Sequence, residues 1–503
     1  MVYIIFFWLI RLPFWEVPLH RNEGLFAYIG QEINRGYLPY KDVLDNKPPL
    51  LFYTYWLAFK VMGKETPEVV RGLGFVFTFF TSLLLYSCAE KLRQGSGLWT
   101  AILFAVFSLE LKVEGFSAES EVFMNFFLVL ALFPLLYSSF KMSKFWLSSL
   151  GIGLAFLYKQ VALLYLIPLW IYIYLKQRQK FIPLFALSLS GFMLPLLLFI
   201  FYFLSKKALG DFLQAIFYIN YFYTISAHLT TFEYLKQIIN SLITLAQINW
   251  WLTFWVLSLP VILLIKREKP LAEEVLMYIF LICSWLAVIP SKRFFNYYFI
   301  SSLPFLTFIA VYNLYRLKNF ISFQKWKILL FLSGIMLGIT MKENHLWGLN
   351  LKPQEISSFA TGQSVFYDAS EVANYIASHT SSDAYIYNWG VEWELYFYTK
   401  RRAPTRYINT LFLFIFAQSH REGKFPTQKW ISLQKEYWQD ILTHPPQYII
   451  LTTRLFDLGD KDFFIPQKIL QLLSKNYKLE NTFPPFFALY RFTLKKIKRN
   501  CFL

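Results

Sequence analysis

Long apolar runs separated by short polar segments dominate the first two thirds of the chain. Segments 69–89, 121–139 and 182–204 are almost continuously apolar, and a helix needs about 20 such residues to cross a bilayer. Strands of a membrane barrel are about 10 residues long and alternate in polarity, unlike these runs. The pattern therefore predicts a polytopic α-helical membrane protein.

The same pattern predicts about eleven transmembrane helices. Segment 1–15 is either a short span or a signal-like anchor, and we favour the span because no small-residue cleavage site follows it. Segment 50–62 is only about 13 residues long, so we expect an interfacial or re-entrant helix there. We expect interfacial helices in the first outer loop, 15–68. The predicted spans are 1–15, 69–89, 97–113, 121–140, 146–158, 160–175, 182–204, 250–265, 274–290, 295–315 and 326–342.

Basic residues recur in alternate loops, which predicts the orientation. If the N-terminus is cytoplasmic and 50–62 does not cross, these loops all lie on the cytoplasmic side, as the positive-inside rule requires. If 50–62 crossed, every later loop would change sides. The rule also explains much of the net charge of +18 without nucleic-acid binding. The basic groups are Lys91/Arg93, Lys141/Lys144, Lys176/Arg178/Lys180, Lys266/Arg267/Lys269 and Arg316/Lys318/Lys325/Lys327.

The C-terminal part changes pattern and predicts a soluble α/β domain. Segments 371–378 and 430–442 are expected to be helices, and 384–388 and 448–453 strands. We therefore divide the chain into a membrane module, 1–343, and an extracytoplasmic domain, 344–503. Composition agrees with a membrane protein, because 56% of the residues are hydrophobic and the mean hydropathy is +0.41. The three cysteines, Cys88, Cys283 and Cys501, suggest neither a disulfide framework nor a zinc site.

Charged residues gather in the segments predicted to lie outside. The first outer loop combines Glu23, Asp42 and Asp45 with Arg21, Lys41 and Lys47. A carboxylate there can take a proton from an attacking group, and nearby cations can hold a leaving phosphate. An ordinary solvated loop is the alternative.

A second acidic cluster, Glu114, Glu119 and Glu121, lies at the outer mouth of a predicted span. Ionisable groups at such a position are candidates for function. Alternatively, Glu119 caps the helix that begins near Glu121.

Three cations break the charge rule. Lys159, Lys292 and Arg293 lie on the side where basic residues are scarce, so each needs an anionic partner. A lipid phosphate is one candidate. The acidic clusters and ordinary lipid headgroups are the alternatives.

The order of these motifs resembles the GT-C superfamily of membrane glycosyltransferases, in the bacterial branch of protein O-mannosyltransferases and the lipid A aminoarabinose transferase. The resemblance covers about residues 10–410. It rests on Asn22-Glu23 after the first span, on Gly36 to Asp42, on Lys47-Pro48-Pro49-Leu50, on Glu121, on Lys159 after a Gly-rich span, on Tyr297-Tyr298 after a basic turn, and on Tyr385 to Gly390.

This resemblance implies an inverting transfer of a sugar from a polyprenyl-phosphate donor to a lipid, glycan or protein acceptor. It also implies a multi-pass protein of the cell (inner) membrane, with the active face and the C-terminal domain extracytoplasmic. The implied donor-phosphate contacts are Lys47, Arg71, Lys159, Lys292, Arg293, Tyr297 and Tyr298.

One residue departs from the family pattern. Its usual first acid is Asn22 here, and an amide cannot act as a base. We expect Glu23 to be the general base, with Glu121 second, and Asp42, Asp45 and Glu119 as further loop acids. Whether Mg²⁺ or Mn²⁺ binds among these carboxylates stays open, because clustered carboxylates suit both ions but the branch need not be metal-dependent.

Two other functions compete with the transferase. A transporter or lipid flippase for a glycolipid or polyprenyl-phosphate substrate would show inverted repeats and midplane charges, whereas the charges here gather at one face. An inactive scaffold is the third interpretation. Protein N-glycosylation by transfer of a whole oligosaccharide is not expected, because Leu252 follows Trp250-Trp251 where oligosaccharyltransferases carry an aspartate.

Overall fold

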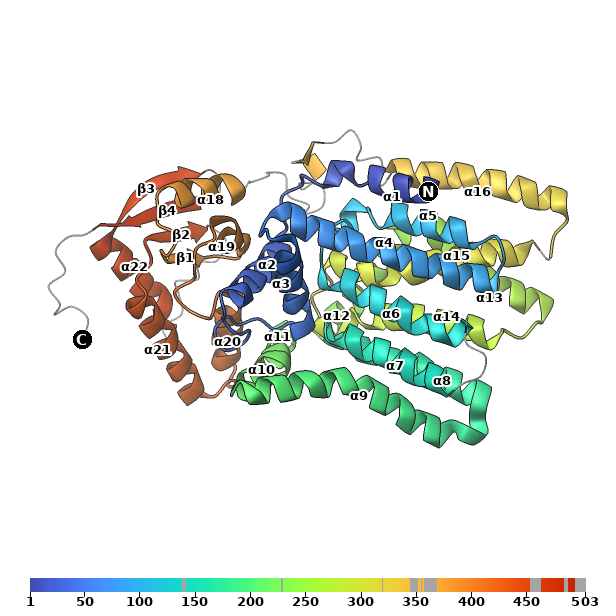
Figure 1. Ribbon diagram of the computed structural model, residues 1–503, viewed down its shortest axis with the longest axis horizontal. Coiled ribbons are helices and arrows are strands. Elements are labelled where there is room, and N and C mark those ends of the chain that lie inside the picture. Colours follow the sequence, from blue (N-terminus) through green and yellow to red (C-terminus); the bar gives the residue numbers. More distant parts are fainter. Residues whose placement is uncertain are drawn as a thin grey trace.

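The molecule has two modules that follow one another along its long axis. Figure 1 shows a bundle of helices and, at the other end, an α/β domain. The computed structural model describes residues 1–137, 142–227, 229–318, 320–343, 352–353, 355–356, 369–452, 463–483 and 487–493.

The bundle is built from apolar helices. Among the described residues, six helical segments are long and apolar enough to cross a membrane, or seven if the bent pair α12 and α13 is one span. The polytopic helical fold is therefore confirmed, while the expected total of eleven stays a prediction. Three of the six are the single helices α4 (Pro67–Leu92), α6 (Ser120–Tyr137) and α16 (Phe323–Glu343). The other three are longer segments: Gln160–Ser205, which contains α8 (Leu166–Gln177) and α9 (Phe181–Ser205); Ala272–Ser291, which contains α14 (Ala272–Leu286); and Asn296–Leu317, which contains α15 (Leu303–Leu317).

The remaining expected spans are short helices. α5 (Gly97–Phe107) and α7 (Ser143–Phe156) have 11 and 14 residues. The first apolar segment is divided between α1 (Val2–Leu9) and a 3-10 turn, Leu12–Phe14. A helix of fewer than about 17 residues crosses the hydrocarbon core only with help from its flanking residues.

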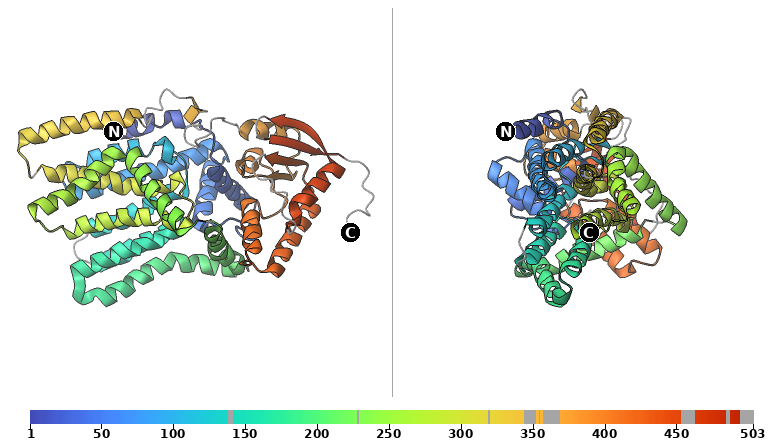
Figure 2. Two further views of the ribbon diagram at one scale, coloured as in Figure 1. Left: turned by 180° about the vertical axis from the view of Figure 1, so that it is seen from behind. Right: turned by 90° about the vertical axis from the view of Figure 1, so that its right-hand side faces the viewer.

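The turns between α8 and α9 and between α15 and α16 lie at the end of the bundle opposite the C-terminal domain (Figures 1 and 2). These turns carry the basic groups around Arg178 and Lys318. This placement agrees with the predicted orientation, in which basic loops and the C-terminal domain are on opposite sides of the membrane.

The first loop forms two helices beside the C-terminal domain. α3 (Pro49–Met62) begins at a proline and ends at Gly63, whose φ of 63° is left-handed. It matches the helix expected over 50–62. α2 (Arg21–Asn34) was not expected at these bounds, because its polar residues do not follow a single helical face.

The C-terminal domain has a four-stranded sheet in the order β1-β2-β4-β3. β1 (Ile386–Trp389) is parallel to β2 (Tyr448–Thr452), and the hairpin of β3 (Tyr477–Phe483) and β4 (Phe487–Phe492) adds antiparallel strands. The α/β prediction is confirmed, although the hairpin was not foreseen. The helices are α18 (Ala369–Ser378), α19 (Glu394–Thr399), α20 (Leu411–Arg421), α21 (Thr427–Thr443) and α22 (Phe464–Asn476). The predicted boundary at 344 lies outside the described residues.

Helix α2 is held by the C-terminal domain. The Tyr28 hydroxyl accepts a hydrogen bond from the Ala403 backbone at 3.0 Å, and Glu32 pairs with Arg402 at 3.2 Å. A Cβ on Gly24 would lie 2.3 Å from the Cβ of Glu394, so α2 and α19 touch where only glycine fits. The two modules therefore meet in close contact around α2, and this contact positions the site described next.

Candidate functional site

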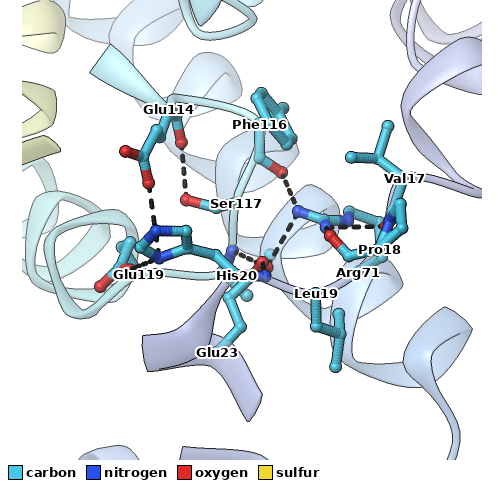
Figure 3. A network of polar contacts seen from close by, with 12 residues as sticks. Val17, Pro18, Leu19, His20, Glu23, Arg71, Glu114, Phe116, Ser117 and Glu119 are labelled. Atoms are coloured by element: carbon cyan, nitrogen blue, oxygen red, sulfur yellow. Dashed lines mark hydrogen bonds and ion pairs between the residues drawn. The ribbon is translucent and has the colours of Figure 1, made fainter. Parts of the chain in front are cut away.

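Glu23, the expected base, is a buried structural carboxylate in the first turn of α2. Its Oε1 accepts from Arg71 Nη1 at 2.9 Å and from the Ala118 backbone N–H at 2.6 Å, and its Oε2 accepts from the His20 backbone N–H at 2.9 Å (Figure 3). Arg71 also donates to the carbonyls of Phe116 and Val17, each at 3.1 Å. The pair thus ties the start of α2 to α4 and to the turn before α6.

A second network surrounds His20. Its Nδ1 lies 3.5 Å from Glu114 Oε2 and 3.5 Å from Glu119 Oε1, and Glu119 Oε1 also accepts from Asn22 Nδ2 at 3.0 Å (Figure 3 shows the His20 contacts). Glu119 is fully buried, and the Oε2 atoms of both acids have no hydrogen-bond partner among the described residues. Glu114 has a left-handed φ of 56°, a strained conformation for a residue other than glycine.

Burial makes the two acids hard to ionise. It raises the pKa of Glu114 to about 7, with the charges of Glu119 and Glu23 adding to the effect and His20 opposing it. The pKa of Glu119 rises to about 8, again through burial first and then through Glu121 and Glu23. The cluster therefore favours bound protons or an added cation.

His20, Glu114 and Glu119 together have the donor set of a metal site. One ligand atom from each lies within 4.8 Å of the others. Glu119 Oε2 has no partner among the described residues and Glu114 Oε2 has only the ion pair with His20, so a cation fits as a further partner of both. A set of one imidazole and two carboxylates suits Mn²⁺ or Zn²⁺ better than Mg²⁺, which prefers oxygen ligands and water.

A cavity of about 440 Å³ opens beside this cluster, between the modules. Its walls come from the first loop, the turn that follows α14, the segment near Tyr223 and the C-terminal domain. The lining residues are His20, Arg21, Asn22, Leu25, Phe26, Asp45, Asn46, Lys47, Glu114, Tyr223, Phe294, Phe295, Asn296, Tyr297, Tyr298, Val391, Trp393, Asn409, Leu411 and Phe412.

Two cations and one further carboxyl group reach the cavity. Within the described part of the chain, neither the Arg21 guanidinium nor the Lys47 ammonium has a side-chain hydrogen bond or ion pair. Asp45 is 2% exposed and accepts the Lys47 backbone N–H at 2.9 Å. Burial raises the pKa of Asp45 to about 6, and the nearby Lys47 charge opposes that rise.

Glu121 and Lys159 form an ion pair behind the cavity wall. Both are buried, and the Ser120 hydroxyl donates to Glu121 Oε2 at 2.7 Å. Lys159 Nζ also lies 4.0 Å from the ring centre of Tyr298, which lines the cavity. The partner of Lys159 in this structure is therefore an acid of the second cluster, one of the alternatives left open by the sequence.

The other predicted contacts lie around the cavity. Arg293 donates to Ser226 Oγ at 2.8 Å, Lys292 Nζ lies 5.5 Å from the Tyr234 ring centre, and Asp42 accepts from the Leu38 backbone in a turn. Of the thirteen predicted site residues, those that line the cavity are Asn22, Asp45, Lys47, Tyr297 and Tyr298; the described lining does not include Glu23, Asp42, Arg71, Glu119, Glu121, Lys159, Lys292 or Arg293.

Sequence reasoning did not select His20, Trp393 and Asn409, and it named Arg21 only among the cations of the first outer loop. His20 and Arg21 directly precede the Asn22-Glu23 motif, so their place in the loop was the available signal. Trp393 and Asn409 come from the distant C-terminal domain, and no pattern connects them to the first loop.

Comparisons with known proteins agree with the expected superfamily. Residues 46–203 match the sequence model of the family described as dolichyl-phosphate-mannose-protein mannosyltransferase. None of the curated proteins matches the chain by sequence.

Three of the matching solved structures illustrate the shared fold. ArnT from Cupriavidus metallidurans bound to undecaprenyl phosphate is 12% identical, with a TM-score of 0.62 and 98% of both chains covered. Its apo form is 13% identical, with a TM-score of 0.60 and 97% coverage of both chains. Archaeal oligosaccharyltransferase AglB from Archaeoglobus fulgidus, in complex with an inhibitory peptide and a dolichol-phosphate, is 12% identical, with a TM-score of 0.50 over 99% of this chain and 75% of that one. The resemblance to the GT-C superfamily is confirmed at the level of the fold.

Proposed function

We propose that the protein is a glycosyltransferase that moves a sugar from a polyprenyl-phosphate donor to a lipid, glycan or protein acceptor. One observation carries the proposal: a cavity between the modules combines an unpaired Arg21, an unpaired Lys47 and the carboxyl group of Asp45. Cations suit a phosphate leaving group, and a carboxylate suits an attacking hydroxyl. Two structures with this fold are described with lipid phosphates, which supports the donor class.

In this proposal the cavity residues divide the reaction between them. The acceptor oxygen attacks the anomeric carbon, and its proton passes to Asp45. The bond from that carbon to the phosphate oxygen breaks, and the departing lipid phosphate is held by Arg21 and Lys47. A direct displacement of this kind inverts the anomeric centre. Asp45 replaces Glu23 as our candidate base, because all of the Glu23 contacts are structural.

We also propose that His20, Glu114 and Glu119 hold a divalent cation, Mn²⁺ or Zn²⁺ in preference to Mg²⁺. Such an ion would add positive charge beside the departing phosphate. Asn22 helps to fix this set, since its amide orients Glu119. The active face then lies on the extracytoplasmic side of the cell membrane, with the C-terminal domain above it.

The test uses purified protein in liposomes with a radiolabelled polyprenyl-phosphate sugar. Asp45→Asn should abolish transfer while donor binding persists. Asp42→Asn, on the same loop but outside the described cavity lining, is the matched control and should transfer normally. Uptake of the donor into vesicles without any transfer would overturn the proposal in favour of the transporter.

A further inference from the structure

Helix α12 (Thr231–Ile248) turns sharply away from the direction of its neighbour. It meets α13 (Trp250–Lys266) at 103°. α13 packs beside the spanning helix α15, where Asn313 Nδ2 donates to the Trp255 carbonyl at 2.8 Å. α12 therefore runs close to the plane of the membrane, as the view along the long axis in Figure 2 also indicates.

The residues of α12 fall into three lengthwise faces at helical spacing. One face packs on the protein: Leu245 and Ile248 are buried, and the Tyr234 hydroxyl donates to the Ile289 carbonyl at 2.9 Å. A second face is apolar and exposed, with side chains between 38% and 76% exposed. It consists of Phe232, Leu235, Ile239, Leu242 and Ile243.

The third face is polar and exposed, formed by Glu233, Lys236, Asn240, Thr244 and Gln247. At about 100° per residue, its centre lies about 110° around the helix from the centre of the apolar face. A helix in water would not line up five exposed apolar side chains, and a helix in hydrocarbon would not expose a polar row. Two exposed faces of opposite character fit a boundary between water and lipid.

The apolar face of α12 continues into lipid-facing surface. Around the bend, α13 exposes Leu257 and Val261 by more than half. The other end of α12 begins with a capping box in which Thr230 and Glu233 exchange hydrogen bonds, and Glu233 is exposed to water. The N-terminal end of α12 is therefore exposed to water, and its C-terminal end continues into apolar surface.

We propose that α12 lies in the headgroup region of the bilayer leaflet on the cavity side, with its apolar face among the acyl chains. The partner is the phospholipid surface itself. α12 also touches the cavity wall, because Tyr234 contacts Phe294 with ring centres 5.9 Å apart and Phe294 lines the cavity. Contact with the leaflet therefore sets the depth of that wall. If the proposed function holds, this contact places the cavity wall at the level of the donor phosphate in the leaflet; this step rests on the proposed function.

The test places an environment-sensitive fluorophore on single cysteines of the full chain in phospholipid vesicles. The background is Cys501→Ser, since Cys88 and Cys283 are buried; labelling of this background is measured as the blank. The labelled positions are Ile239→Cys, its neighbour Asn240→Cys, and Leu257→Cys on α13 as the deep control.

We expect the label at 239 to be quenched most by a lipid spin label near the headgroup, the label at 240 by aqueous iodide, and the label at 257 by a spin label deep in the acyl chains. Equal iodide quenching at 239 and 240 would place α12 in water. Equal quenching of the labels at 239 and 240 by the deep spin label would place α12 inside the acyl chains, as half of a broken span. Either result overturns the proposal, and none of these measurements needs transferase activity.

A functional arm links the helix to the donor. Ile239→Asp should raise KM roughly tenfold for a long-chain polyprenyl donor and leave a short-chain soluble donor unaffected, whereas Asn240→Asp should change neither. An equal rise for both donors would mean that the helix acts through the fold, not through the leaflet.

Discussion

Replacing Glu23 by Gln removes the negative charge opposite Arg71 but keeps the shape of the side chain. The Arg71 guanidinium would then be buried without a counter-charge, and the new amide N–H₂ would face a donor, either Arg71 or a backbone N–H. Removing one partner of a fully buried ion pair costs about 3–5 kcal/mol. Because folded proteins are stable by only about 5–15 kcal/mol, this is a large fraction of the total.

We therefore expect Glu23→Gln to lower the thermal unfolding midpoint and the yield of folded protein. The molecules that do fold should still transfer sugar, because the carboxylate does not reach the cavity. Thermal unfolding is monitored by size-exclusion chromatography of heated samples. Transfer activity is then measured per folded molecule. Glu268→Gln is the control, since it breaks the exposed pair with Arg316 and should cost less than about 1 kcal/mol.

Asp45→Asn should give the opposite pattern, with near-normal unfolding and no transfer. The reasoning is refuted if Glu23→Gln keeps the normal unfolding midpoint and loses transfer, because that result would return the role of base to Glu23.

Three further predictions follow from the same contacts. Burial, reinforced by Glu392, raises the pKa of Glu394 from 4.5 to about 8, so the folded state should lose stability as pH rises from about 4.5 to 8. Glu394→Gln should flatten this dependence of the unfolding free energy on pH, and an unchanged slope would assign the dependence to other groups. Lys47→Met should weaken donor binding about tenfold or more in a radioligand assay, whereas Lys41→Met, exposed on the same loop, should not. Mn²⁺ should raise the unfolding midpoint of the wild-type protein, and His20→Ala should abolish that rise; a rise that survives in His20→Ala would place the ion elsewhere.

The apolar pattern was enough to predict the bundle, but not the ends and breaks of its helices. Residues 160–175 were predicted as one helix, yet the structure divides them between a 3-10 segment, Gln160–Tyr165, and α8. The bounds of helix α2, within the first outer loop, could not be predicted for another reason. Its polar residues Gln31 and Glu32 are buried against the C-terminal domain, and a sequence does not reveal a partner that is hundreds of residues away.

The sequence predicted which residues share one region of the molecule, but not which side chains contact one another. Charge and topology brought Glu23, Glu121, Lys47 and Lys159 to one end of the bundle, and the structure places them there. Sequence could not tell which acids are neutralised by buried cations. That depends on the approach of Arg71 to Glu23 and of Lys159 to Glu121, which comes from helix packing.

The attachment of α2 to the C-terminal domain has a consequence for biosynthesis. Hydrogen bonds to this helix and the residues before it come from positions 366 to 379 residues further along the chain. Contacts of such long range form late, because the chain must first be made and its ends brought together. During synthesis the polar groups of the first loop therefore stay exposed until the chain has left the ribosome up to Ala403, of 503 residues. A chain that stops before residue 391 would lack not only most of a domain but also one wall of its own cavity.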